Sequence, residues 1–111
     1  MRRCAGVPPG EKLTDEEGDV AKLSDDEVRQ GLSTLPDWER EGDAIVKEYR
    51  FDGFGDAIAF VVRVAFRAEK ANHHPDLDVR YNRVRVALST HSDGGITAKD
   101  LALAAEVDAA A

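Results

Sequence analysis

The chain is poor in cysteine and has no long apolar run, and both features narrow its possible location. Cys4 is the only cysteine among 111 residues, so the chain cannot form an internal disulfide and offers no thiolate zinc site. No apolar stretch approaches the length of about 20 residues that crosses a bilayer. The apolar part of residues 1–9 is too short for a signal peptide. We therefore expect a protein of a reducing, cytoplasmic compartment with no membrane partner.

Basic residues are outnumbered by acidic ones, 15 against 22. The formal net charge is −7, and residues 11–27 hold eight acids against two lysines. Residues 28–111 are nearly balanced, with fourteen acids against eleven bases. A chain without a basic footprint lacks the usual means of binding phosphate backbones. An acidic front would moreover repel nucleic acid, so we expect no nucleic-acid partner.

The length and local composition indicate a single domain behind a tail. Residues 1–22 contain Pro8-Pro9-Gly10 and an acid cluster but almost no apolar periodicity. Such a segment buries too little apolar surface to offset the entropy of ordering it. We predict a flexible N-terminal tail over residues 1–22 and one domain over residues 23–111.

Apolar periodicity in the first half predicts two helices separated by two strands. Ser24 and Glu27 form the pattern of a capping box, which predicts a short helix before Pro36. A brief strand at 38–40, a turn at 41–43 and a longer strand at 45–51 follow. A second helix then runs towards Pro75, which disfavours helical geometry at the residue before it. Its apolar face is predicted from helical spacing to contain Phe54, Ile58, Val61, Val62, Ala65 and Ala68.

The second half predicts a hairpin and a last helix. Apolar residues alternate over 77–81 and over 84–88, with a tight turn near Asn82-Arg83. Thr97 and Asp100 have the spacing of a helix cap. The predicted fold class is α+β, a four-stranded antiparallel sheet with helices packed on one face, in the order α-β-β-α-β-β-α.

All three histidines lie beside the ends of predicted elements. His73 and His74 come at the exit of the second helix, and His91 comes just after the last strand. In the predicted sheet these two ends can lie at the same edge, so the three imidazoles could share one cleft. Imidazole can donate and accept protons near neutral pH, which favours proton transfer or polar ligand binding.

Two other interpretations of the histidines remain open on residues alone. They could be structural, hydrogen-bonded residues without a chemical role. They could also bind zinc, with Asp76 or Glu69 completing the ligands. Adjacent histidines lack the one-turn spacing of a helical zinc pair, and we predict no metal.

A long, spaced set of motifs resembles the pterin-4a-carbinolamine dehydratase family. The resemblance covers about residues 23–107, including Trp38, Phe51 and Phe54. The motifs that carry it are Ala68-Glu69-Lys70-Ala71-Asn72-His73-His74-Pro75-Asp76, Tyr81-Asn82-Arg83-Val84, Leu88-Ser89-Thr90-His91 and Gly95-Ile96-Thr97-Ala98-Lys99-Asp100. The chain has Leu77 where family members often carry an aromatic residue, and Asn72 where an aspartate is common.

This resemblance implies a reaction and a set of site residues. The reaction is loss of water from 4a-hydroxytetrahydrobiopterin to give quinonoid dihydropterin, a step of tetrahydrobiopterin recycling that needs no cofactor. His73 and His91 would be the acid–base pair, exchanging roles between the two hydroxyl epimers, and His74 would hold the substrate. Further substrate contacts are implied for Asn72, Ser89, Thr90 and Ser92. Glu69 could orient an imidazole, and Asp100 could support the site or simply cap its helix.

The resemblance also implies partners and an alternative function. Members of the family form homodimers or homotetramers, and an uncovered strand edge would allow sheet-edge pairing. Some relatives serve as dimerisation cofactors of a transcription factor. The alternative function is therefore a non-catalytic cofactor or protein-binding module on the same fold.

Overall fold

The fold is a four-stranded antiparallel sheet with three α-helices, seen in a computed structural model that describes residues 21–111. The element order is α-β-β-α-β-β-α, as predicted, with one short 3₁₀-helix added before the last helix. The helices are α1 (Asp25–Leu32), α2 (Phe54–Ala71) and α3 (Ala98–Ala110), and η1 is His91–Asp93. The strands are β2 (Glu39–Glu41), β3 (Ala44–Arg50), β4 (Asp76–Arg80) and β5 (Arg83–Leu88). The predicted flexible tail lies almost wholly outside the described residues.

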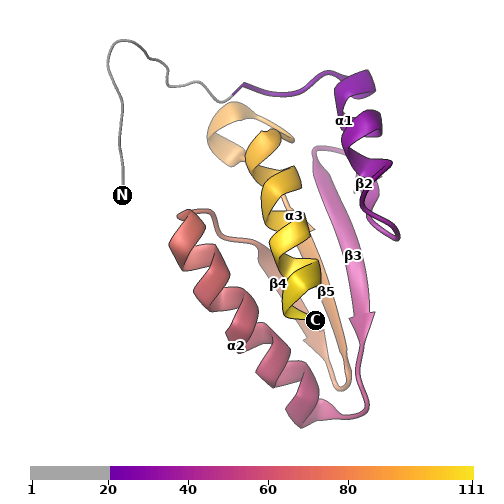
Figure 1. The fold of residues 1–111 in the computed structure, drawn as a ribbon, viewed down its shortest axis with the longest axis vertical. Helices are drawn as coiled ribbons and strands as arrows, with labels where there is room; N and C mark the ends of the chain where they lie inside the picture. Colours follow the sequence, from indigo (N-terminus) through magenta and orange to yellow (C-terminus); the bar gives the residue numbers. More distant parts are fainter. Residues whose placement is uncertain (1–20) are drawn as a thin grey trace.

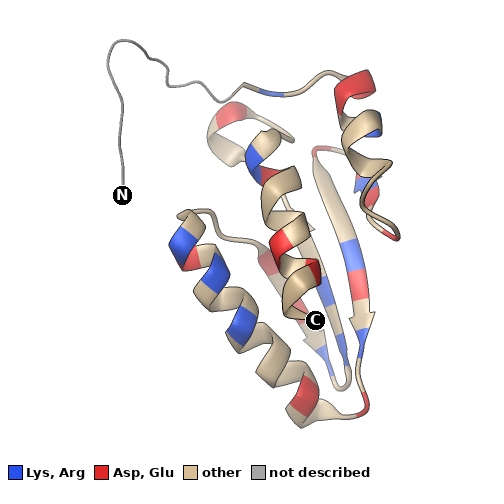
Figure 2. Ribbon diagram, in the orientation of Figure 1, with Lys and Arg blue, Asp and Glu red and all other residues tan. Residues whose placement is uncertain are grey.

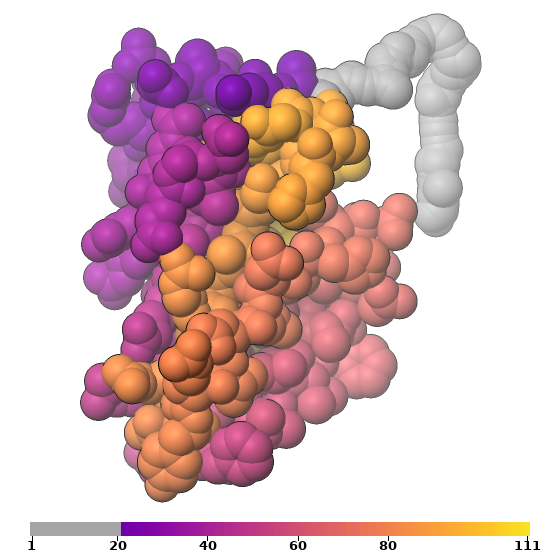
Figure 3. Space-filling model, turned by 180° about the vertical axis from the view of Figure 1, so that it is seen from behind, coloured from indigo at the N-terminus to yellow at the C-terminus, as the bar shows by residue number. Residues whose placement is uncertain are grey.

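The spatial order of the strands is β2-β3-β5-β4, with every neighbouring pair antiparallel. Strand β5 therefore runs between β3 and β4. Helices α2 and α3 lie across one face of the sheet (Figure 1). Among residues 21–111, no helix covers the opposite face, and Figure 3 shows the strands there in front. We call this second surface the open face.

The core lies between the helices and the inner face of the sheet. Alternation along β5 buries Val84, Val86 and Leu88 completely, because successive side chains of a strand point to opposite faces. They pack with Phe60 of α2 and Leu103 of α3 in one apolar cluster.

Both predicted helix caps are confirmed. Ser24 and Glu27 form a reciprocal capping box at the start of α1, and Thr97 and Asp100 form another at the start of α3. Each box satisfies backbone N–H groups that have no partner within the helix. Helix α1 also packs close to α3, since a Cβ added at Gly31 would lie 2.4 Å from a methyl carbon of Leu101.

The predicted apolar face of α2 is largely wrong. The fully buried positions are Ala57, Phe60, Val64 and Ala68, of which only Ala68 was expected. Phe54 and Val62 are instead 54% and 48% exposed. The helix carries apolar residues on two stripes, and the stripe with Ala57, Phe60 and Val64 packs into the core.

Two turns also differ in detail from the prediction. Helix α2 ends at Ala71 because Asn72 adopts a left-handed conformation (φ 53°), so the helix stops before Pro75 can act. The β4–β5 turn is formed by Tyr81 and Asn82, one residue earlier than expected. The Asn82 side chain donates to the Phe51 carbonyl (2.9 Å) and ties this turn to the start of α2. No helix among the described residues is long and apolar enough to cross a membrane.

Candidate active site

Two backbone hydrogen bonds close the C-terminal end of α2 and fix the position of the segment that carries His73 and His74. The N–H of Asn72 bonds to the Glu69 carbonyl, and the N–H of His73 bonds to the Ala68 carbonyl, both at 3.1 Å. This 6→1 bond around a left-handed residue is the Schellman closure of a helix. Asparagine tolerates the left-handed conformation better than most residues, which accounts for Asn72 at this position.

The segment after β5 brings the third histidine to the same place. Thr90 and Gly95 form an isolated antiparallel bridge, with Thr90 N–H donating to the Gly95 carbonyl at 2.9 Å. The bridge closes a short loop that contains η1 and places His91 at its first position. The end of the interior strand β5 therefore meets the exit of α2, as the sheet-edge argument predicts.

One cavity of about 290 Å³ gathers the predicted residues. It is lined by Asn72, His73, His74, Ser89, Thr90, His91, Ser92 and Lys99. The structure thus brings together all seven residues expected to bind substrate, and it adds Lys99. Glu69 and Asp100 do not line the cavity but stand behind its histidines.

His73 is held by the buried carboxylate of Asp100. The Asp100 side chain is fully buried, and its Oδ1 lies 2.5 Å from His73 Nε2. The other oxygen, Oδ2, accepts from the Thr97 backbone N–H and from the Thr90 hydroxyl, both at 2.9 Å. Asp100 therefore caps α3 and orients His73 at once. Because Nε2 is occupied, Nδ1 is the His73 nitrogen left for a ligand.

Thr90 takes part in the hydrogen bonds around the Asp100 carboxylate. Its side chain is buried, and its hydroxyl lies 2.8 Å from the Thr97 hydroxyl as well as bonding to Asp100. Both partners are buried groups at the start of α3, so the Thr90 hydroxyl stabilises the carboxylate that holds His73.

His74 has a carboxylate partner of a different kind. Its Nε2 lies 2.6 Å from Glu69 Oε1, and the two side chains are 60% and 74% exposed. The sequence suggested Glu69 as a group that could orient an imidazole, and the structure pairs it with the imidazole of His74. The ring of His91 is hydrogen-bonded to none of the described residues, and η1 leaves it exposed.

Lys99 is the site residue that sequence reasoning missed. It stands in the first turn of α3, where a cation opposes the positive end of the helix dipole. Its position beside Asp100 in the predicted cap could have indicated it, because the start of α3 faces the histidines.

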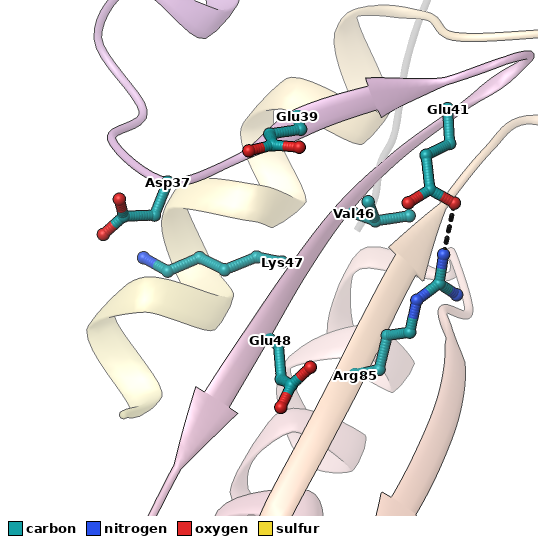
Figure 4. Close-up of a pocket in the computed structure, with 7 residues that line it drawn as sticks. All are labelled: Asp37, Glu39, Glu41, Val46, Lys47, Glu48 and Arg85. Carbon is teal, nitrogen blue, oxygen red and sulfur yellow. Dashed lines mark hydrogen bonds and ion pairs between the residues drawn. The ribbon is translucent and has the colours of Figure 1, made fainter.

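Other charged hollows lie on the open face, away from the histidines. One of about 320 Å³ is lined by Val46 and six charged residues, with Arg85 paired to Glu41 (Figure 4). Within residues 21–111, no three His, Cys, Asp or Glu side chains converge as a set of metal ligands.

Comparison with known proteins identifies the family. The family model described as pterin 4 alpha carbinolamine dehydratase matches residues 21–110. A protein of Chloroflexus aurantiacus named as a pterin-4-alpha-carbinolamine dehydratase is 55% identical over 89 residues, covering 80% of this chain and 96% of that protein. A Mycobacteroides abscessus protein of the same name is 51% identical over 89 residues, covering 80% and 95%.

Two solved structures share the fold. One is described as a transcriptional coactivator/pterin dehydratase from Brucella melitensis; it has a TM-score of 0.79 and 36% identity, covering 81% of this chain and 98% of that one. The other is a pterin dehydratase-like protein identified as a RuBisCO assembly factor in the alpha-carboxysome, with a TM-score of 0.54 and 23% identity, covering 66% and 84%. The second likeness concerns the fold alone. The chain belongs to the pterin-4a-carbinolamine dehydratase family and is a hydro-lyase of that activity.

Proposed function

We propose that the three histidines dehydrate 4a-hydroxytetrahydrobiopterin by acid–base catalysis, as a step in tetrahydrobiopterin recycling. The observation that carries this proposal is one cavity lined by all three imidazoles, with His73 anchored on a buried carboxylate. Loss of the 4a-hydroxyl requires a proton on the leaving oxygen, and the new double bond requires removal of the proton on N5. Two imidazoles in opposite protonation states perform both transfers, and the product is quinonoid dihydropterin and water.

The contacts of each histidine support distinct roles. His73 keeps Nδ1 for proton transfer because Asp100 occupies Nε2, and the carboxylate fixes the tautomer and stabilises the imidazolium formed when the ring takes a proton. His91 is the second proton-transfer group, and the pair exchanges acid and base roles between the two hydroxyl epimers. His74, aligned by Glu69, holds the substrate.

The other residues of the site either bind the pterin directly or position His73. Asn72, Ser89 and Ser92 offer polar side chains at the cavity wall and bind the pterin edge. Thr90 and Asp100 act through His73 and are positioning residues. Neither a metal nor an organic cofactor is required, because both bond changes are proton-coupled.

The test is dehydration of each freshly generated 4a-hydroxy epimer by wild type, His73→Ala and His91→Ala. The His91 ring is exposed and hydrogen-bonded to none of the described residues, so its removal leaves the fold intact. We expect each variant to lose at least about 100-fold in kcat, with the two variants differing in which epimer suffers more. A control is Glu48→Gln, which changes a carboxylate on the open face outside the cavity. Wild-type rates in both histidine variants would sink the proposal.

We also propose that the chain forms a homodimer or homotetramer. Strand β4 pairs only with β5 among the described strands, so its other edge is free. A second surface is the apolar stripe of α2, where Phe54, Val62 and Phe66 are 54%, 48% and 72% exposed.

Light scattering tests this assembly. We expect more than one chain per particle, and we expect Phe66→Ser to lower the particle mass or weaken association. A strict monomer would contradict the assembly.

The exposed apolar stripe of α2 also supports the alternative function, a protein-binding module like the coactivator named in the Brucella relative. That non-catalytic alternative predicts a partner whose binding Phe66→Ser abolishes, together with no dehydration above the uncatalysed rate by the wild-type protein.

A further inference from the structure

A second cavity meets the histidine cavity at His91. It has a volume of about 340 Å³ and is lined by Asp43, Ala44, Asp76, Ser89, His91 and Gly94. Ser89 and His91 line both cavities. The two hollows therefore share a wall at Ser89 and His91, and the second adds Asp43, Ala44, Asp76 and Gly94 to the residues beside the candidate active site.

The strand order explains why two carboxylates line the second cavity. Strand β5 lies between β3 and β4, and the chain leaves β5 just before Ser89. Asp76 is the first residue of β4 and pairs in register with Ala87. Asp43 immediately precedes β3, whose Ile45 pairs with Leu88. The two aspartates therefore approach the end of β5 from opposite sides.

The two cavities differ in charge. The cavity with His73 and His74 contains Lys99, whose ammonium group is a donor only. The second cavity contains two carboxylates, which are acceptors only when ionised. Among the described residues, no lysine or arginine lines it. A ligand spanning His91 thus meets donors at one end and acceptors at the other.

A pterin has matching polarity. Its pyrimidine ring carries N3–H and a 2-amino group side by side, and a single carboxylate can accept from both. Placing this donor edge beside Lys99 would oppose N–H groups to an ammonium, whereas placing it in the second cavity pairs it with carboxylates. We infer that Asp43 and Asp76 are specificity residues that bind the 2-amino and N3–H edge of the pterin, leaving N5 and carbon 4a among the histidines. This inference rests on the proposed function of the histidine cavity.

The experiment replaces each carboxylate by its amide. Asp43→Asn, Asp76→Asn and the double variant remove the charge but keep the shape, and both residues are exposed, so folding is unaffected. For the double variant we expect KM for the 4a-hydroxypterin to rise about 10- to 100-fold, as for loss of charge-assisted hydrogen bonds. The value of kcat should stay within about threefold, because no proton-transfer group is touched. Glu48→Gln, a carboxylate on the open face that lines neither cavity, should leave both constants unchanged.

Equilibrium binding gives a readout that does not depend on turnover. A 7,8-dihydropterin is compared with its 2-oxo analogue, which presents an acceptor where the pterin has an amino group. Wild type should prefer the amino compound, and the double variant should lose most of that preference, because an amide can donate to the 2-oxo group. A double variant with wild-type KM and unchanged preference would overturn the inference.

The two readouts separate this inference from the proposed function. If wild type turns over and the double variant has an unchanged KM, the specificity assignment fails while the dehydratase stands. If wild type does not turn over but its preference for the amino compound depends on Asp43 and Asp76, the specificity assignment stands and the catalytic proposal fails.

Discussion

Two aspartates at opposite ends of α3 show how one side chain type serves two purposes. Asp100, in the first turn, is fully buried and gathers His73, Thr90 and the Thr97 N–H. Asp108, in the last turn, is partly exposed and gathers the indole N–H of Trp38, the ammonium of Lys47 and the hydroxyl of Tyr49. Each carboxylate joins elements distant in sequence, but only Asp100 touches a residue of the histidine cavity.

The charge of the partners separates the two ends. Lys47 lies 2.8 Å from Asp108 and forms an ion pair with it. Burial by itself would raise the pKa of Asp108, but hydrogen bonds from Lys47, Tyr49 and Trp38 outweigh burial and hold that pKa below its ordinary value. Asp108 therefore fastens the end of α3 to β3 and the start of β2. Figure 2 shows acidic positions near both ends of this helix. We therefore expect substitution of Asp100 to lower the dehydration rate. We expect substitution of Asp108 to lower only the free energy of unfolding.

Asp100→Asn gives the largest expected effect. The amide oxygen can still accept from the Thr97 N–H, but the NH₂ group is a donor and cannot accept a hydrogen bond from His73 Nε2–H, so the ring loses its fixed tautomer. We expect kcat for dehydration to fall by about 100-fold or more, the usual contribution of a positioned acid or base. Steady-state kinetics with the 4a-hydroxypterin measures this loss.

The matched control for Asp100→Asn is the same substitution at Asp108 in the same helix. Asp108→Asn should leave kcat near the wild-type value. If both variants lose kcat equally, the division of roles between the ends of α3 is wrong.

The largest loss of stability is expected from a substitution at the C-terminal end of α3. Asp108→Ala leaves Lys47, Tyr49 and Trp38 without their shared acceptor. We expect the free energy of unfolding to drop by about 1–3 kcal/mol, the cost of leaving partly buried polar groups unsatisfied. Urea unfolding followed by tryptophan fluorescence measures it, since Trp38 is the only tryptophan. An unchanged urea midpoint would show that these bonds contribute no net stability.

Alkaline pH should weaken the fold through Tyr49. Burial and the hydrogen bond to Asp108 raise the pKa of Tyr49 far above its ordinary value. Because the folded pKa is raised, the stabilisation is fully present below the unfolded pKa of about 10 and is lost as pH rises above it. Urea unfolding between about pH 9 and pH 11 should show this fall. Tyr49→Phe should flatten it, and an equally steep fall in that variant would assign it to other groups.

Local sequence patterns predicted the parts of the fold that depend on neighbouring residues. The capping boxes at Ser24 and Thr97 follow from residues three positions apart, and the structure contains both. The shared location of the histidines also followed from the order of elements, because antiparallel pairing fixes which ends meet. The interpretation of Asp100 as either cap or site residue was too narrow, since its two oxygens serve both at once.

Long-range packing set the parts that the sequence did not predict. Both apolar stripes of α2 repeat at helical spacing, so periodicity cannot choose between them, and only packing in the folded core buries Ala57, Phe60 and Val64. The partners of Asp108 lie 59 to 70 residues away along the chain. Nothing in the last turn of α3 indicates which strand it will meet.

The smallest expected effect is at the exposed pair Glu69 and His74. Glu69→Gln keeps an acceptor for His74 Nε2 but removes the charge, and a pair that is 60% and 74% exposed is screened by solvent. We expect at most a fewfold rise in KM, with stability within about 0.5 kcal/mol of wild type. The contrast with Asp100→Asn is the informative quantity, because both variants remove a carboxylate charge from an imidazole and differ mainly in burial. If Glu69→Gln lowers kcat as much as Asp100→Asn does, then burial is not what makes Asp100 important, and His74 transfers a proton itself.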